Sequence, residues 1–391
     1  MPNIADIIEV AEELEGKAVI AVPERCVAVR NRNSSCRKCI DACIADAIEV
    51  HNNALSVNAA TCVSCGACVV VCPTEALVST EPLDEELEQA AAAAMDAAGE
   101  DRAVVACARI AARGVADPRK FAEVPCLARV GEALLVGLAA CGAQSITLVD
   151  GDCSTCKYRA TSPGVDATVA STDALLAAQG SALRVERASE FPAGFELADS
   201  ASLLGESRRG FFTSAGSWTA SAAEKTANLV IRKNLGMKQS AKTLREQLGA
   251  GKSGSLPQLS ERRHAQVLDA MDRLGQPAAE VLHTRLFGRV SIDASVCNAC
   301  GMCAVFCPTG ALSKSAIKPS PNADGTPDGG SFLEFSAADC VQCGLCVDAC
   351  MKKCLILEDD VPLAELFDFE PRFLYLPKPG RRPGILSSFK K

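Results

Sequence analysis

The chain has 391 residues, which is too long for one compact core, so two to four domains are expected. Only 4% of the residues are aromatic and the formal net charge is −8, which together disfavour nucleic-acid binding and suit a basic protein partner. The 22 cysteines could form disulfides in a secreted chain, but the N-terminus is acidic from Asp6 onward and lacks the regions of a signal peptide. No uncharged apolar run reaches the roughly 18 residues that a membrane helix needs. We therefore expect a cytoplasmic protein without a transmembrane segment, whose thiols bind metal.

Residues 1–80 are predicted to form a module built on two cysteine runs. Within this module, a short strand over Lys17–Val22 is expected before the first cysteine. Three thiols at intervals of three, then a fourth four residues on and a proline, make up the bacterial-ferredoxin ligand run for a [4Fe-4S] cluster. In this pattern the fourth thiol ligates the neighbouring cluster. The complete run, which ends before Pro73, contains Cys62, Cys65, Cys68 and Cys72. A variant run before it contains Cys36, Cys39 and Cys43.

Crosswise ligation between these runs predicts two clusters in the first module. The variant run lacks a thiol close before Cys36, so we assign its outermost ligand to Cys26, across an insertion over Val27–Ser35. The alternative for Cys26 is a buried free thiol beside a three-thiol cluster. With Cys26 as a ligand, one cluster is expected on Cys26, Cys36, Cys39 and Cys72. The other cluster is expected on Cys43, Cys62, Cys65 and Cys68.

Residues 81–195 are predicted to be an α/β domain with a mostly parallel sheet. A helix over 81–98 has acidic residues in its first turn and Gly99 at its end. Strands are expected over Ala103–Cys107, Phe121–Cys126, Ser145–Val149 and Leu183–Val185. Helices are expected over Gly131–Ala140 and near Ser171–Ala178. Strands that alternate with helices imply this architecture.

Three cysteine positions of this domain follow the ends of predicted strands, at the edge where such sheets place ligands. An additional metal site is therefore expected on Cys107, Cys126, Cys153 and Cys156. A Cys-x-x-Cys after a strand is also the thioredoxin layout, and inert buried cysteines are a third interpretation. Cys141, on the apolar helix, is predicted to be a core thiol.

Two strings in this domain resemble the iron–sulfur delta subunit of methyl-viologen-reducing hydrogenases. One is Val-Pro-Cys-x-x-Arg-Val over Val124–Val130, and the other is Gly-x-Cys…Cys-x-Tyr over Gly151–Tyr158. The resemblance implies a [2Fe-2S] centre and a complex of hydrogenase or heterodisulfide-reductase type. This chain departs from that family because its last two thiols lie closer together, and because a single Cys107 stands where the family has a pair.

Residues 196–285 are predicted to be a helical connector, with helices over Ala222–Leu248 and Ser260–Leu274. The loop between these helices contains Gly-Lys-Ser, the end of a phosphate-binding motif. Glu246 stands where that motif needs its first glycine, and a helix rather than a strand precedes the loop. We interpret the loop as a hinge.

Residues 286–360 are predicted to be a second module, because two more runs of the ferredoxin pattern lie there. By crosswise ligation, one cluster is expected on Cys297, Cys300, Cys303 and Cys350. The other is expected on Cys307, Cys340, Cys343 and Cys346. Cys354 is left over and is treated as a non-ligand. Residues 361–391 are predicted to be a basic extended tail, which is disordered or lies along an acidic subunit.

Structural zinc is the alternative to iron for these runs. Zinc sites usually show two short cysteine pairs separated by a dozen or more residues, which give four tetrahedral ligands to one ion. Here the thiols follow one another in runs of four, a spacing that suits a cubane and crowds a single ion. The sequence therefore favours iron–sulfur clusters.

Both cysteine-run modules resemble the bacterial two-cluster ferredoxin family, so the chain is expected to be polyferredoxin-like. The fold class is α+β multidomain, with two ferredoxin-like dicluster modules flanking the α/β domain and its helical connector. We expect about four [4Fe-4S] clusters that relay electrons to or from a catalytic subunit of an anaerobic oxidoreductase, and no substrate site of its own. Partners would be flavin or metal oxidoreductase subunits, or carriers such as ferredoxin. The alternatives are a self-contained thiol- or cluster-based reductase using the middle domain, and an iron–sulfur assembly scaffold.

Overall fold

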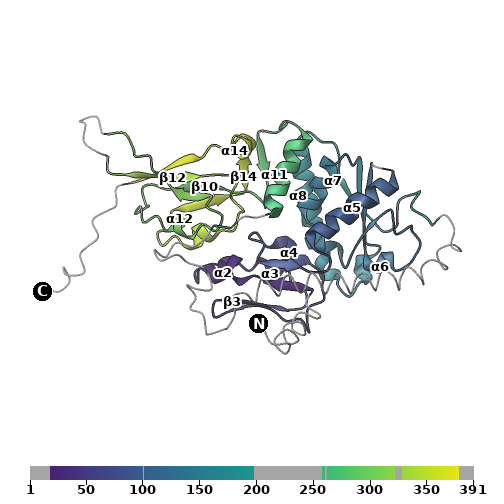
Figure 1. The fold of residues 1–391 in the computed structure, drawn as a ribbon. Coiled ribbons are helices and arrows are strands. Elements are labelled where there is room, and N and C mark those ends of the chain that lie inside the picture. Colours follow the sequence, from purple (N-terminus) through teal and green to yellow (C-terminus); the bar gives the residue numbers. More distant parts are fainter. Residues whose placement is uncertain (1–17, 100, 198–257, 260–261, 322–327, 378–391) are drawn as a thin grey trace, which may run out of the picture.

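A computed structural model of the chain describes residues 18–99, 101–197, 258–259, 262–321 and 328–377. The predicted helix over Ala222–Leu248 and the Gly-Lys-Ser loop lie outside the described residues. Figure 1 shows three bodies: the N-terminal module in purple, the middle domain in blue and teal, and the C-terminal module in green and yellow. Within the described residues, no helix combines the length and the apolar character needed to cross a bilayer.

The N-terminal module is built from two antiparallel pairs of short strands around its cysteine loops. Strand β1 (Val19–Ala21) pairs antiparallel with β4 (Leu77–Ser79), and β2 (Ile48–His51) pairs antiparallel with β3 (Ala54–Val57). The short helices are η1 (Pro23–Arg25), α2 (Val27–Arg30), α3 (Lys38–Asp41) and α4 (Ala67–Val71). The insertion predicted after Cys26 therefore contains a helical turn. Apolar side chains from both strand pairs share one core with the cysteines.

The middle domain has the predicted parallel sheet, with strand order β6-β5-β7-β8. Its strands are β5 (Arg102–Cys107), β6 (Ala122–Val124), β7 (Ser145–Val149) and β8 (Val185–Ala188). Val105, Val124 and Leu148 are fully buried, as expected for a sheet covered on both faces. The helices are α5 (Asp84–Ala98), α6 (Ala108–Ala111), η2 (Leu127–Arg129), α7 (Glu132–Ala140), η3 (Cys153–Thr155), η4 (Arg159–Thr161) and α8 (Ser162–Ala178).

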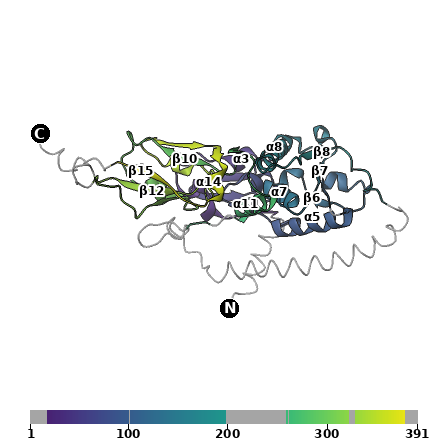
Figure 2. The ribbon, with the colours of Figure 1, turned by 90° about the horizontal axis from the view of Figure 1, so that it is seen from above.

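Helix α11 (Arg262–Leu274) is the described part of the predicted connector, and it forms where Ser260–Leu274 was expected to be helical. Its buried residues Val267 and Met271 belong to one apolar core with Val136 of α7 and Phe287 of the C-terminal module. Figure 2 shows α11 between the C-terminal module and the middle domain. The connector is therefore part of a core that joins the two bodies.

The C-terminal module extends beyond the predicted boundary at residue 360. Its strand pairs are β9 (Val281–His283) with β14 (Asp360–Pro362), and β10 (Arg289–Ile292) with β13 (Leu355–Glu358). A three-stranded sheet consists of β11 (Leu312–Lys314), β12 (Ser331–Phe335) and β15 (Arg372–Leu376). The helices are α12 (Met302–Phe306), α13 (Leu345–Asp348) and α14 (Leu363–Phe367).

The prediction of an extended tail from residue 361 is wrong for residues 361–377. Leu363, Leu366 and Leu376 are almost fully buried in the core of the module, and β15 is hydrogen-bonded along β12. Alternation of polar and apolar residues over β15 buries Leu374 and Leu376 and exposes Phe373 and Tyr375. The basic residues had suggested disorder, whereas the alternating apolar residues form a strand.

The sequence places the two modules on either side of the middle domain, but in space they also contact each other. The backbone N–H and hydroxyl of Ser35 donate hydrogen bonds to one carboxylate oxygen of Asp348, at 2.7 and 2.9 Å. Lys38 Nζ donates to the carbonyl oxygen of Gln342 at 3.3 Å. The loop before α3 thus lies against the cysteine loop and helix α13 of the other module.

Candidate iron-sulfur sites

The Cys26 site is the first of two thiol groups in the N-terminal module. It consists of Cys26, Cys36, Cys39 and Cys72. Cys26 is buried at the start of α2, and Cys39 and Cys72 contact the same core. Burial raises the pKa of the Cys39 thiol to about 12, and the nearby thiols of Cys72, Cys26 and Cys36 contribute to that shift. The structure therefore brings Cys26 to the other three thiols across the insertion.

The Cys43 site is the second thiol group of this module. It consists of Cys43, Cys62, Cys65 and Cys68. Burial raises the pKa of the Cys68 thiol, and the neighbouring Cys65, Cys62 and Cys43 raise it further. In both groups, three of the thiols belong to one stretch of chain and the remaining one comes from the other run. Crosswise ligation of two clusters by these thiols stays a prediction.

Two thiol groups of the same kind lie in the C-terminal module. The Cys297 site consists of Cys297, Cys300, Cys303 and Cys350. The Cys307 site consists of Cys307, Cys340, Cys343 and Cys346. Burial raises the pKa of Cys303 to about 11, with Cys300, Cys297 and Cys350 nearby. Burial also raises the pKa of Cys346 well above its usual value, and Cys340, Cys343 and Cys307 add to this.

Backbone N–H groups donate hydrogen bonds to thiols that are predicted to ligate a cluster built mainly on the other run. Ala47 N donates to Cys43 Sγ at 3.3 Å, and Ala76 N donates to Cys72 Sγ at 3.2 Å. Leu312 N donates to Cys307 Sγ at 3.4 Å. Such donors stabilise a thiolate and the added negative charge of a reduced cluster. The repetition of this bond in both modules supports a shared role for these thiols.

Cys354, which was predicted to be a non-ligand, lies at the Cys297 site. Its Sγ is 3.5 Å from Cys350 Sγ, and its side chain is buried. It follows Cys350 by four residues, as Ala47 follows Cys43 and Ala76 follows Cys72. The repeated cysteine pattern could have revealed Cys354, because it stands four residues after the last thiol of its run, where the other runs have alanine.

The distances between thiols bear on the choice between zinc and a cubane. Four sulfurs around one zinc ion, each at 2.3 Å from it, would lie about 3.8 Å from one another. In the part of the chain that the structure describes, no three cysteine sulfurs lie within 4.8 Å of one another. The thiols of each group are therefore not gathered as closely as the four ligands of one zinc ion would be.

The middle-domain cavity is a separate and larger space. It has a volume of about 450 Å³ and lies at the carboxyl ends of the parallel strands. Its lining includes the four cysteines that were predicted to meet there, Cys107, Cys126, Cys153 and Cys156. Cys107 ends β5, Cys126 follows β6, and Cys153 begins η3 after β7. The sheet topology thus gathers thiols that are scattered in the sequence, as the strand-end rule predicts.

An ion pair lies at the edge of this cavity. Arg187 forms an ion pair with Asp150, and Asp150 Oδ2 accepts a hydrogen bond from Cys153 Sγ at 3.3 Å. Burial raises the pKa of Cys153 to about 12, and the charge of Asp150 contributes to the shift. A thioredoxin-type nucleophile needs a lowered thiol pKa. The surroundings of Cys153 therefore disfavour the thioredoxin interpretation.

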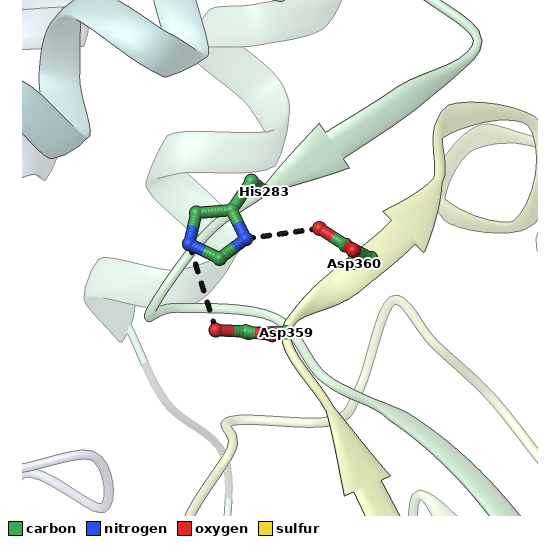
Figure 3. A group of neighbouring side chains, drawn as sticks. All are labelled: His283, Asp359 and Asp360. Carbon is green, nitrogen blue, oxygen red and sulfur yellow. Dashed lines mark hydrogen bonds and ion pairs between the residues drawn. The ribbon is translucent and has the colours of Figure 1, made fainter.

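Two other groups of residues lie away from these sites. Cys141 is exposed at the C-terminal end of α7, so the prediction of a core thiol is wrong: the apolar helix ends before this side chain reaches the core. Figure 3 shows His283 between Asp359 and Asp360, with ring-to-carboxylate distances of 3.5 and 2.9 Å. All three are exposed. This group is a surface ion-pair cluster that ties β9 to β14.

Comparison with known proteins matches the two ferredoxin-type regions. Residues 296–354 match the family model described as 4Fe-4S dicluster domain, and residues 55–78 match the one described as 4Fe-4S binding domain. Neither match extends into the middle domain, so the resemblance to a hydrogenase delta subunit gains no support from them.

An alignment 115 positions long, which covers 23% of this chain, shows 33% identity to pyruvate-flavodoxin oxidoreductase of Trichormus variabilis (strain ATCC 29413 / PCC 7937). The chain spans only 9% of the length of that relative. No solved structure matches. The chain therefore contains 4Fe-4S-binding regions of the ferredoxin type in two places, which indicates iron–sulfur electron transfer.

Proposed function

We propose that this protein is an electron-transfer subunit that holds four [4Fe-4S] clusters and passes electrons to or from a catalytic subunit of an anaerobic oxidoreductase. The observation that carries the proposal is that both regions with cysteine runs match 4Fe-4S-binding family models. The runs supply sixteen thiols, enough for four cubanes with four thiolates each. The partner would be a flavin- or metal-containing subunit, or a carrier such as ferredoxin.

The clusters would supply one-electron redox chemistry, and the chain supplies the four thiolates and the backbone donors at each site. N–H donors to Cys43, Cys72 and Cys307 would favour the reduced form and so raise the reduction potential. Because every iron of a cubane would carry a cysteine thiolate, these sites leave no iron open to a substrate. We therefore assign them to electron transfer rather than to catalysis.

The middle-domain cavity favours a second candidate function. Its volume of about 450 Å³ falls in the range of small-molecule sites, and it contains four thiols together with Arg109, Lys157 and Tyr158. A [2Fe-2S] centre held by some of these cysteines, beside a bound substrate, would make the protein a reductase in its own right.

Iron and sulfide analysis of anaerobically purified protein, combined with EPR, tests the first proposal. Four cubanes require about sixteen irons per chain, and a further [2Fe-2S] centre would raise this to about eighteen. Colourless protein rich in zinc would refute the proposal. Turnover by the isolated chain, with no other subunit present, would instead support the reductase.

A further inference from the structure

The two modules meet at their ligand-bearing loops. Ser35, which is bonded to Asp348, directly precedes Cys36, and Gln342, which accepts from Lys38, directly precedes Cys343. Each of these two cysteines therefore stands next to a residue that is hydrogen-bonded across the boundary between the modules. The Cys26 and Cys307 sites are therefore neighbours across the module boundary.

Within each module, one pair of thiols links the two sites. Cys39 of the Cys26 site lies on α3, and Cys68 of the Cys43 site lies on α4. Cys303 of the Cys297 site lies on α12, and Cys346 of the Cys307 site lies on α13. Helix α3 contacts α4, and α12 contacts α13, so these links follow from the packing of the short helices that carry the thiols.

The Cys43 site continues into the middle domain. Cys65 belongs to the same apolar core as Cys107, and Cys126 contacts that core. A Cβ atom added to Gly66 would lie 2.8 Å from Cβ of Arg129, three residues after Cys126, so the two backbones approach closely here.

From these contacts we infer that the five sites form one unbranched line: the Cys297 site, the Cys307 site, the Cys26 site, the Cys43 site and then the middle-domain cavity. The junction between the modules is the pair Cys36 and Cys343, and the cavity is one end of the line. At the other end Cys300 is exposed, and the adjacent Met351 is 90% exposed. The line thus begins at the surface of the C-terminal module.

This order rests on the proposed function, because it assumes that the four thiol groups are loaded. Each transfer moves one electron, so that one site is oxidised and the next is reduced by the same amount, and no bond forms or breaks. A flavin- or cluster-carrying protein would exchange single electrons at the Cys297 end. At the cavity end, an acceptor that takes two electrons would need two such transfers.

Two variants with complementary losses test the order by EPR. The first keeps only the Cys26 and Cys307 sites, through Cys62→Ala, Cys65→Ala, Cys297→Ala and Cys300→Ala. The matched control keeps only the Cys43 and Cys297 sites, through Cys36→Ala, Cys39→Ala, Cys340→Ala and Cys343→Ala. Each variant is expected to hold about eight irons in its two remaining sites. After reduction with dithionite, the first should show signals broadened by magnetic interaction and fast relaxation, and the control should show the sharper, slowly relaxing signals of isolated clusters.

Equal spectra from the two variants, or a stronger interaction in the control, would overturn the order. Should either variant fail to bind iron, anomalous scattering at the iron edge from crystals of the unmodified holoprotein gives the positions directly. The expected result is that the clusters of the Cys26 and Cys307 sites are adjacent across the module boundary. Full iron content with a different order would refute the line alone, whereas protein without [4Fe-4S] signals would refute the proposed function.

Discussion

The guanidinium group of Arg263 donates a hydrogen bond from Nη2 to the backbone carbonyl of Cys72 at 3.2 Å. The guanidinium group also donates to the carbonyl of Val69 at 2.7 Å. The backbone N–H of Arg263 donates to the carboxylate of Glu75 at 2.8 Å. These bonds attach helix α11 to the last turn of α4, which ends at Cys72 of the Cys26 site. Arg262 forms an ion pair with Glu88 of the middle domain, and His264 contacts Ala338 of the C-terminal module. Three successive residues of α11 therefore join the three bodies of the protein.

Replacing Arg263 by alanine should lower the free energy of unfolding by about 2 kcal/mol, because a half-buried charged group would lose its bonds to backbone carbonyls. The matched control is Arg262→Ala. Arg262 is more exposed and bonds to Glu88, so its loss should cost no more than about 1 kcal/mol. Denaturant unfolding of the holoprotein measures both values, and equal losses would contradict the role given to Arg263.

A pair of glycines at equivalent positions tests the contact between the N-terminal module and the middle domain. Gly66 and Gly344 both follow the second thiol of a run, and both have φ of 76°. An alanine at either position would cost about 1 kcal/mol in this left-handed conformation. Only at Gly66 would the new methyl collide with a neighbour, since Arg129 Cδ would lie 2.5 Å away and nothing lies within 4 Å of the corresponding position at Gly344.

Gly66→Ala should therefore destabilise the protein by clearly more than Gly344→Ala, and it should alter the spectrum of any centre in the middle-domain cavity. Thermal unfolding and EPR of the two variants provide the measurements. If both variants lose the same stability and have unchanged spectra, the close approach of the Cys43 site to the middle domain is refuted.

His264 is expected to make the free energy of unfolding depend on pH. Its Nε2 lies 2.7 Å from the carbonyl of Ala338, and its ring contacts Phe287 at a centroid distance of 4.2 Å. Desolvation lowers its pKa to about 4, from the usual 6.5. Because the unfolded chain binds a proton at a higher pH than the folded chain, stability should fall as the pH drops from about 6.5 to 4 and change no further from this cause below 4.

The expected loss is up to about 3 kcal/mol, from a shift of roughly two and a half units. Denaturant titrations over this pH range, with iron content followed in parallel, measure it. His264→Gln should remove the dependence. A variant whose acid sensitivity equals that of the unmodified protein would show that other groups cause it.

Cys350 and Cys354 differ in their expected contribution to the Cys297 site. Cys350 occupies the position of Cys43 and Cys72 in the repeated pattern, so Cys350→Ala should lose about four irons per chain. Cys354→Ala restores the alanine found at Ala47 and Ala76 and should keep the full iron content. Loss of iron from Cys354→Ala alone would identify Cys354 as the ligand.

The sequence predicted the strands of the middle domain well, and the grouping of the thiols stays a prediction. The cysteine spacing indicated crosswise sets, and the apolar runs at Ala103–Cys107 and Ser145–Val149 indicated buried parallel strands, which the structure contains as β5 and β7. These predictions depend on ligand spacing and on the burial of apolar residues, and both are determined by residues that lie close together in the sequence.

The contacts between bodies could not be predicted in the same way. Nothing near Ser35 indicates that it binds Asp348, because the two residues are brought together by the whole fold. The sequence analysis does not predict strand β15, because the basic residues and prolines on either side of its apolar side chains suggest disorder. Its alternating leucines become informative only once β12 provides a partner.

The pairing of β12 with β15 also bears on how the protein is made. The ligands of the Cys26 and Cys43 sites all lie between residues 26 and 72, and the strands around them end at Ser79. The C-terminal module completes its sheet only when Leu376 arrives. During synthesis, the N-terminal thiols can therefore fold and receive metal while the ribosome is still translating the rest, whereas the later thiols must wait nearly three hundred further codons.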